Sequence, residues 1–470
     1  MDYLVILKAR FFKSINLFSA LTFLLVLLLP TQLGFHFWSS FSFVAGLRID
    51  YYSPTIYLTD ILLTLVLFIK VQPCNAPGLN LFKSFKSFFK SIIHYPSATF
   101  FFLFSLYSIK LPHPWLHLYG LARALEVFLL FWIIKNLKNL KPVFWGLVGA
   151  VSYTTILATA QFLSQRAISG KWYFLGERWF TSETPGIAQT QIFGKLLLRP
   201  YATFSHPNSM AGFLLISLWL IFYLAKSFGL HKKTSLLPAA CCLLPAASLG
   251  ILLSFSHTAW LVFLISILIY IFKPLRIMYY VLRITLFISL TFPIILLTTA
   301  HFFPLLAQHE EIYLRNFLAQ KGIEAFLQKP FLGQGINHFI HFLGSYRPGL
   351  LSRTFYQPIH NIWWLILAET GLVGLVFALW LTLKTIKKIC LPSRRRHSLW
   401  RRTADVGRTP VVKQAGGVLK SQITNHYHNS LLLSLISIFL LAATDHYLLT
   451  LQQNRLLLGL FLGLVWRKTK

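Results

Sequence analysis

Histidine, arginine and amide side chains gather in three segments that adjoin long apolar runs. The first segment, residues 198–208, holds Arg199, His206 and Asn208 and contains two prolines. Proline fixes the backbone angle φ, so we expect these polar groups in a defined arrangement where the following apolar run begins. The alternative is an ordinary arginine and histidine beside prolines that start a helix.

The second segment begins with Arg315, within residues 312–327. Apolar side chains recur there with the spacing of an amphipathic helix that lies along a membrane surface. An arginine at such a surface can bind phosphate oxygens through two parallel hydrogen bonds. Alternatively, Arg315 pairs with Glu311 one helical turn away, as surface charges often do. Gln334, Gly335 and His338 follow in the same segment.

The third segment is His360-Asn361, at the mouth of the next apolar run. Glu369 lies eight residues further on, about 12 Å into that run if it is helical. Carboxylates inside apolar helices are costly and are usually paired or functional. Glu369 is expected either to orient the His360 end through an interhelical hydrogen bond or to take part in chemistry. For Glu126 we expect an ion pair with Arg123, three residues earlier.

The composition excludes a soluble enzyme. Of 470 residues, 56% are hydrophobic and only 12% are charged, against roughly a quarter charged in soluble domains. About twelve apolar runs are long enough, or nearly so, to cross a bilayer, which predicts one all-α polytopic transmembrane domain over residues 1–470. The runs lie at residues 15–30, 55–70, 97–111, 116–134, 143–163, 207–225, 235–254, 257–272, 279–300, 361–383, 429–444 and 455–466.

The net charge of +32 reports topology. With an even number of spans and a cytoplasmic amino terminus, 30 of the 44 Lys and Arg residues fall in predicted cytoplasmic segments, as the positive-inside rule requires. A nucleic-acid partner is therefore not expected. The topology gives a first outer loop at 164–206, a main outer loop at 301–360 with amphipathic helices, and a basic cytoplasmic loop at 384–428 that is either solvated or in contact with anionic membrane lipid. Both termini are expected in the cytoplasm.

Known metal and nucleotide motifs are absent from the sequence. It has no CxxC, HExxH, GxSxG or phosphate-binding glycine loop, and its four cysteines lie in a predicted span or in cytoplasmic loops. We therefore expect neither a metal nor a cofactor.

Three motifs together resemble the O-antigen ligase and polymerase superfamily. His360-Asn361, nine residues and then Gly371-Leu372-Val373-Gly374 is similar to its HN-x9-GxxG signature, and Gly333-Gln334-Gly335 after Pro330 resembles its PxxGxG segment. Residues 199–208 resemble its RPxGTFxHPN-like segment, with Ala202 in place of glycine. A further turn, Ser254–Trp260, has His257 where the family often has arginine. The resemblance covers residues 195–390.

The resemblance implies an integral membrane enzyme similar to C-type glycosyltransferases. It would transfer a glycan from an undecaprenyl-diphosphate carrier to an acceptor glycolipid, glycan or glycoprotein, on the outer face of the cytoplasmic membrane. Applied to this sequence, it makes His360 the general base, oriented by Asn361 or Glu369, and makes Arg199 and Arg315 the groups that bind the diphosphate. Contacts to substrate are expected from His206, Asn361, Gln334, Gly335, His338 and Glu369, and sugar stacking from Trp172, Tyr173, Trp179, Tyr346 and Tyr356.

Three alternatives stay open. The same motifs fit a polymerase that extends the lipid-linked glycan. A flippase or transporter of that glycan would need a polar track along several spans, whereas the polar residues here concentrate in the predicted outer loops. A structural membrane scaffold would not need His360.

Overall fold

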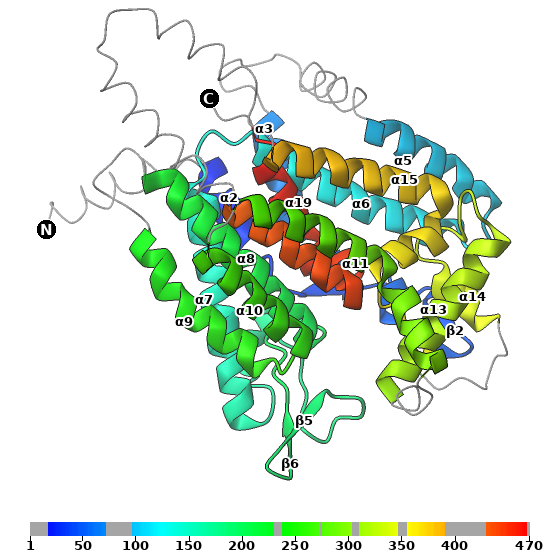
Figure 1. Cartoon of the computed structure of the whole chain (residues 1–470), viewed down its shortest axis with the longest axis horizontal. Helices are drawn as coiled ribbons and strands as arrows, with labels where there is room; N and C mark the ends of the chain where they lie inside the picture. Colours follow the sequence, from blue (N-terminus) through cyan, green and yellow to red (C-terminus); the bar gives the residue numbers. More distant parts are fainter. Residues whose placement is uncertain are drawn as a thin grey trace, which may run out of the picture.

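The chain is mostly helical, as the sequence predicts (Figure 1). The computed structural model describes residues 17–71, 96–229, 237–272, 275–302, 310–345, 355–390 and 429–467. Most of the predicted basic loop at 384–428, and Tyr346 among the predicted sugar-stacking residues, lie outside these ranges. Strands occur in the described part only as three short antiparallel pairs.

Each of the twelve apolar runs contains a helix. These are α2 (Leu17–Leu27), α3 (Leu58–Val71), α5 (Pro96–Tyr107), α6 (Pro114–Lys135), α7 (Lys141–Ser164), α8 (Pro207–Gly229), α9 (Leu237–Leu253), α10 (His257–Phe272), α11 (Leu275–Phe302), α15 (Ile362–Cys390), the helix Asn429–Thr444 and α19 (Gln452–Val465). The predicted break near residues 254–258 is present, because α9 ends at Leu253 and α10 begins at His257.

Five helices of the described residues are long and apolar enough to cross a membrane by themselves. They are Pro114–Lys135, Lys141–Ser164, Pro207–Phe228, Tyr280–Phe302 and Ile362–Cys390, and shorter apolar helices accompany them. These helices make the chain a multi-pass membrane protein. The total of twelve spans, and the side of the membrane on which each loop lies, stay predictions.

Helix α8 forms the centre of the main helical core. It packs against α7, α9, α10 and α19 (Figure 1), and its Phe213 and Trp219 side chains are fully buried. Helix α8 begins at Pro207, inside the segment 199–208. Burial of α8 therefore fixes the position of the end of that segment.

Two glycines let α19 approach α6 closely. A Cβ atom at Gly459 would lie 2.8 Å from the carbonyl oxygen of Val127, and one at Gly463 would lie 2.6 Å from Cβ of Ile134. Small residues at such positions allow helix backbones to pack tightly in membranes. This contact positions the start of α19, which follows the candidate site.

Outside the apolar helices, short elements form a second layer. The helices are α13 (Glu310–Gln328), α14 (Phe339–Gly344) and α18 (Tyr447–Thr450), with 3-10 turns η1 (Ser40–Ser42), η2 (Asp50–Tyr52), η3 (Ser108–Lys110) and η4 (Gly170–Leu175). The strand pairs are β1 (Gly34–His36) with β4 (Thr55–Tyr57), β2 (Phe43–Val44) with β3 (Leu47–Arg48), and β5 (Gln189–Ile192) with β6 (Lys195–Leu198). The helix predicted over residues 312–327 is α13.

A second hydrophobic core joins residues 34–57 to the 310–345 region. The phenol oxygen of Tyr52 accepts hydrogen bonds from the backbone N–H groups of Ile340 (2.7 Å) and His341 (3.3 Å) at the start of α14. Val44 packs in the same cluster. The first helix N–H groups lack partners within their own helix, so Tyr52 caps α14 from a segment about 290 residues earlier.

Helix α15 is broken at Gly371, where φ is +63° and ψ is −162°. The break frees backbone groups that bond to residues 330–335: Gln334 N–H donates to the carbonyl of Ala368, Gly335 N–H to that of Glu369, and Leu372 N–H to that of Pro330. A Cβ at Gly371 would lie 2.4 Å from the carbonyl of Phe331. The GxxG and PxxGxG motifs are therefore joined by backbone hydrogen bonds at a helix break, and they do not pack as two continuous helices.

The predicted ion pair between Arg123 and Glu126 is confirmed, and it belongs to a larger network. Nη1 of Arg123 lies 2.8 Å from carboxylate oxygens of both Glu126 and Asp60. The side-chain amide of Gln452 donates to Asp60 and to Glu126 at 2.8 and 2.9 Å. Charges inside an apolar bundle are tolerated when paired in this way, and the network ties α3, α6 and α19 together.

We predict that Arg123→Met strongly destabilises the protein, because it leaves two buried carboxylates without their cation. Removing one partner of a buried ion pair costs about 3–5 kcal/mol, which thermal unfolding in detergent would show as a clear drop in Tm. Arg48→Met is the matched control. Arg48 is 55% exposed and pairs with Asp50 at 3.5 Å, and exposed pairs contribute about 1 kcal/mol or less. Equal Tm values for the two variants would contradict the prediction.

Candidate active site

His360 lies immediately before α15, with its two ring nitrogens in different surroundings. Nε2 is 3.2 Å from the side-chain oxygen of Gln357. An amide oxygen only accepts hydrogen bonds, so Nε2 carries the proton and Nδ1 keeps its lone pair. Nδ1 is buried, has no hydrogen-bond partner, and lies 3.9 Å from Oδ1 of Asp445. His360 therefore offers one basic nitrogen next to a carboxylate.

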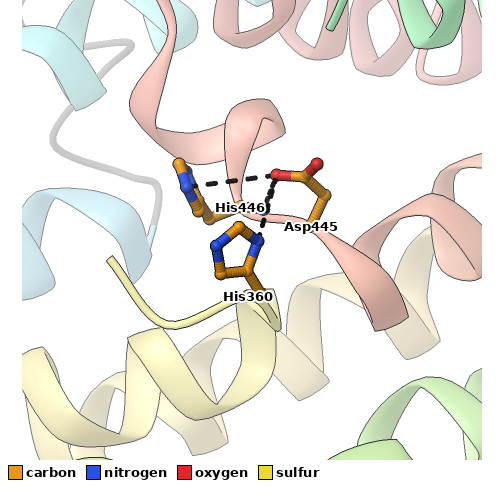
Figure 2. A group of neighbouring side chains, drawn as sticks. All are labelled: His360, Asp445 and His446. Atoms are coloured by element: carbon orange, nitrogen blue, oxygen red, sulfur yellow. Dashed lines mark hydrogen bonds and ion pairs between the residues drawn. The ribbon is translucent and has the colours of Figure 1, made fainter. Parts of the chain in front are cut away.

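Asp445 and His446 complete this group from the other end of the chain (Figure 2). They follow the helix Asn429–Thr444 and precede α18. Nε2 of His446 lies 4.0 Å from Oδ1 of Asp445, and its ring centre is 5.0 Å from that of His360. In the part of the chain that the structure describes, His360, Asp445 and His446 form a group whose donor atoms are near enough to one another to ligate a metal ion.

Arg315 reaches the same group from α13. Its Nη1 donates to the backbone carbonyl of Thr444 at 3.2 Å, one residue before Asp445. The remaining N–H donors of the guanidinium group stay available for other contacts. The pairing with Glu311 that the sequence left open is not among the ion pairs of the described residues.

Arg199 is joined to Asp445 through an amide. Its Nη2 donates to the side-chain oxygen of Asn208 at 2.7 Å, and the Asn208 amide nitrogen lies 3.4 Å from Oδ2 of Asp445. His206 accepts a hydrogen bond at Nδ1 from the backbone of Asn208 at 3.2 Å, and its ring is exposed. The predicted segment 199–208 thus reaches the site mainly through Asn208.

Gln161 of α7 holds the backbone of this segment in place. Its side-chain oxygen accepts from the N–H groups of Tyr201 (3.0 Å) and Ala202 (2.7 Å), and its amide donates to the carbonyl of Ala202 and to the Glu177 carboxylate. Ala202 has a φ of +48°, a left-handed conformation that glycine adopts without strain. This conformation explains why a glycine is the usual residue at position 202 in the resembling motif.

The turn between α9 and α10 contacts Arg199 through its backbone. The Ser254 carbonyl accepts from Nε of Arg199 at 2.8 Å. His257, which stands where the resembling family often has arginine, is exposed and packs edge-on against Trp260. Arg199 is therefore held by the backbone of this turn at Ser254.

The side chain of Asn361 forms hydrogen bonds with backbone groups and not with the His360 ring. Its side-chain oxygen accepts from the N–H groups of Trp363 and Trp364, which caps the start of α15, and its amide donates to the carbonyls of Ser289 and Ala443. An asparagine at this position satisfies N–H groups that lack helical partners. Asn361 thereby fixes the position of His360, whereas Gln357 and Asp445 lie beside its ring.

Four predicted substrate-binding residues gather at the break in α15 instead. The side-chain amide of Gln334 donates to the Ala325 carbonyl, and the backbone N–H of Gly335 donates to the Glu369 carbonyl. Nδ1 of His338 donates to the Ile336 carbonyl. The Glu369 carboxylate accepts from the backbone N–H of Phe339 at 3.4 Å. Glu369 lies eight residues beyond Asn361 on α15, a distance of about 12 Å along the helix. The Glu369 carboxylate therefore faces the start of α14, and its effect on the orientation of His360 stays a prediction.

A small pocket opens beside His360 and Arg315. Its other lining residues are apolar except Asn361, and three of them lie on α11. The lining residues are Phe292, Pro293, Leu296, Arg315, Ala319, Ile359, His360 and Asn361. Its volume of about 10 Å³ is enough for roughly one water molecule.

Burial and charge set the protonation of this group. Burial lowers the pKa of His360 to about 3, although the Asp445 charge opposes the shift. Burial alone would raise the pKa of Asp445, but the neighbouring His446, His360, His206 and Arg315 lower it overall. At neutral pH the imidazole of His360 is therefore neutral and able to accept a proton, and Asp445 is ionised.

The aromatic residues predicted to stack on sugars differ in exposure. Tyr173 and Trp179 are 60% and 76% exposed, and Trp172 packs against the main core. Tyr356 is only 3% exposed, so the expectation that it stacks on a sugar does not hold in this structure.

Asp445, His446 and Gln357 are the site residues that the sequence analysis missed. Asp445 is one of only 12 acidic residues, and it stands alone as an acid among residues 429–470, directly after an apolar run. That isolation was a usable signal, since a carboxylate at the end of a span is usually paired or functional. Gln357, three residues before His360, carried no such signal.

Comparison with known proteins identifies part of the chain. Residues 240–379 match a family model described as O-antigen ligase. This range contains Arg315, His360 and Glu369, whereas Arg199 and Asp445 lie outside it. No curated protein matches the chain.

We predict that the protein loses stability as the pH falls from 7 to 5, in part through His338. Burial lowers the pKa of His338 to about 4 from an ordinary 6.5, so between these values the unfolded chain binds a proton that the folded chain excludes. Stability then falls by about 1.4 kcal/mol per pH unit for one histidine. Unfolding of His338→Leu should depend less steeply on pH. An unchanged slope in His338→Leu would refute the assignment.

Proposed function

Residues 240–379 belong to the O-antigen ligase and polymerase superfamily, and from this premise we propose that the protein transfers a glycan from undecaprenyl diphosphate to an acceptor hydroxyl. The chain is a membrane glycan enzyme of the O-antigen ligase or polymerase type. The observation that carries the finer proposal is the unpartnered Nδ1 of His360, which faces Asp445, in a residue that lines the same pocket as Arg315.

His360 acts as the general base in this proposal. Nδ1 takes the proton of the acceptor hydroxyl while the hydroxyl oxygen bonds to the anomeric carbon of the donor glycan. The proton then lies between Nδ1 and the Asp445 carboxylate, 3.9 Å away, which stabilises the imidazolium that forms. Gln357 keeps the proton of neutral His360 on Nε2. These contacts fix the tautomer as well as the position of the base.

Arg315 and Arg199 balance the negative charge of the leaving group. The bond between the anomeric carbon and the phosphate oxygen breaks, and its electron pair leaves with undecaprenyl diphosphate. Fixed cations stabilise charge that develops in the transition state. Asp445 lies near Arg315, and Glu311 lies within electrostatic reach of Arg199, so the diphosphate is proposed to bind through the guanidinium N–H groups, which suit phosphate oxygens, and not through an excess of positive charge. The bound anion also raises the pKa of His360 toward the working pH, which favours proton acceptance.

The apolar wall of the pocket supports a lipid-linked donor. Phe292, Pro293 and Leu296 lie on α11 opposite Arg315 and His360, and Ile294 and Ile295 of the same helix are about half exposed. The isoprenoid chain of the donor would follow this helix into the membrane while its diphosphate contacts Arg315. A flippase is less well supported, because Arg123, Glu126 and Asp60 are paired with one another instead of lining a track.

We predict that His360→Gln lowers the rate of glycan transfer by about 10²–10⁴-fold, the usual contribution of a general base. The assay uses purified protein, an undecaprenyl-diphosphate-linked glycan and candidate acceptors. His257→Gln, at an exposed histidine of the α9–α10 turn, should stay within about twofold of wild type. Wild-type transfer by a folded His360→Gln protein would remove His360 from the mechanism.

Arg315→Met should lower transfer by about 10²–10³-fold, comparable to loss of one group that stabilises transition-state charge. Arg315→Lys should recover only part of the loss, because lysine keeps the charge without the planar fork. Arg48→Met serves as the surface control. Equal rates for Arg315→Met and wild type would contradict the role of this cation.

The same assay separates ligase from polymerase. A ligase moves the glycan onto a new anchor, whereas a polymerase yields a longer glycan that is still attached to undecaprenyl diphosphate. Product mass and sensitivity to mild acid, which cleaves the diphosphate linkage, distinguish the two outcomes.

A further inference from the structure

Two imidazoles lie beside Asp445 (Figure 2), and their other hydrogen bonds are complementary. Each uses one nitrogen to contact a side-chain oxygen on the outside of the group: Nε2 of His360 with Gln357, and Nδ1 of His446 with Thr450 at 2.7 Å. When those nitrogens carry the protons, Nδ1 of His360 and Nε2 of His446 both keep free lone pairs. Both free nitrogens lie beside the same Asp445 oxygen, at 3.9 and 4.0 Å.

This arrangement has the features of a metal site. Histidines that ligate metals donate their other N–H to an oxygen, which fixes the tautomer and the ring. The three donor atoms lie within 4.8 Å of one another. Ligands about 2.0–2.2 Å from a tetrahedral Zn²⁺ would be roughly 3.3 Å apart, so side-chain shifts of about 1 Å or less would close the site. The buried Nδ1 of His360, which has no hydrogen-bond partner, supports the same reading.

We propose that His360, Asp445 and His446 bind a divalent transition metal ion, with Zn²⁺ as the best match, and that the bound ion blocks glycan transfer. Two imidazole nitrogens and one carboxylate oxygen suit Zn²⁺ and do not suit Mg²⁺, which prefers six oxygen ligands. The blocking step rests on the proposed function: an ion on Nδ1 of His360 takes the lone pair that would accept the acceptor proton. The site is thus an inhibitory one that shares the base with the reaction.

Thr450 allows metal affinity to be changed without touching the reacting groups. Its hydroxyl contacts only the outer nitrogen of His446 and its own helix turn. Outer partners of this kind typically change metal affinity by 10–100-fold. Thr450→Val preserves the shape of the side chain and removes this contact.

The binding experiment needs no glycan substrate. Purified protein in detergent is first stripped with a chelator and then titrated with Zn²⁺, and bound zinc per chain and Tm are measured. Wild type should bind one equivalent that His446→Gln lacks, and Zn²⁺ should raise the Tm of wild type only. Thr450→Val should bind 10–100-fold more weakly, Mg²⁺ should have no effect, and Co²⁺ should give the visible absorption of a four-coordinate ion. Equal zinc binding by wild type and His446→Gln would overturn the site.

The activity experiment tests the inhibitory role. Zn²⁺ should stop transfer by wild type over the concentration range that fills the site. Thr450→Val should keep its metal-free rate within about twofold and need 10–100-fold more Zn²⁺ for inhibition. Loss of transfer on chelation, or inhibition at the same Zn²⁺ concentration in both proteins, would overturn it. The outcome is distinct from failure of the proposed function, which full transfer by His360→Gln would reveal whether or not zinc binds.

Discussion

The Asp445 carboxylate lies where four parts of the chain meet. One oxygen accepts from Asn208 at the start of α8, and the other faces His360 before α15 and His446 beside it. Arg315 of α13 contacts the backbone one residue earlier. A carboxylate buried near a membrane is stable only when cations and donors surround it. The two histidines and both arginines lie around Asp445 for this reason. His360 stays neutral there and keeps a free lone pair.

A second constraint fixes the position of the residues around Asp445. The break in α15 at Gly371 exposes carbonyls and N–H groups that bond to residues 330–335, and Tyr52 caps the helix that follows them. Unsatisfied backbone groups are costly in an apolar environment, so the break persists because another segment fills it. Residues 330–335 are thereby fixed to α15, which begins two residues after His360. The positions of His360 and of this segment therefore depend on the same contacts.

The features that come from local sequence were predictable. The apolar runs are helices, α13 forms where the amphipathic pattern is, and Arg123 pairs with Glu126 three residues away. His360, Arg199 and Arg315 were chosen by residue type and motif, and the structure brings all three to Asp445 directly or through one neighbouring residue. The directions of side chains were not predictable: Glu369 faces α14, Tyr356 is buried, and Asn361 positions His360 by capping α15 and not by contact with its ring.

The sequence by itself determined the class of molecule, because hydrophobicity, charge placement and motif spacing are local properties of the chain. A bilayer requires apolar spans and favours positive charge in cytoplasmic loops. Only the tertiary structure decided which side chains lie beside His360. Gln357 is near His360 in sequence, but Asp445 is 85 residues away, and no periodicity links the two. Their contact depends on how the helix Asn429–Thr444 packs beside α15, and on hydrogen bonds from Asn361 to Ser289 and Ala443. Such long-range packing is a property of the folded bundle as a whole and leaves no local pattern to read.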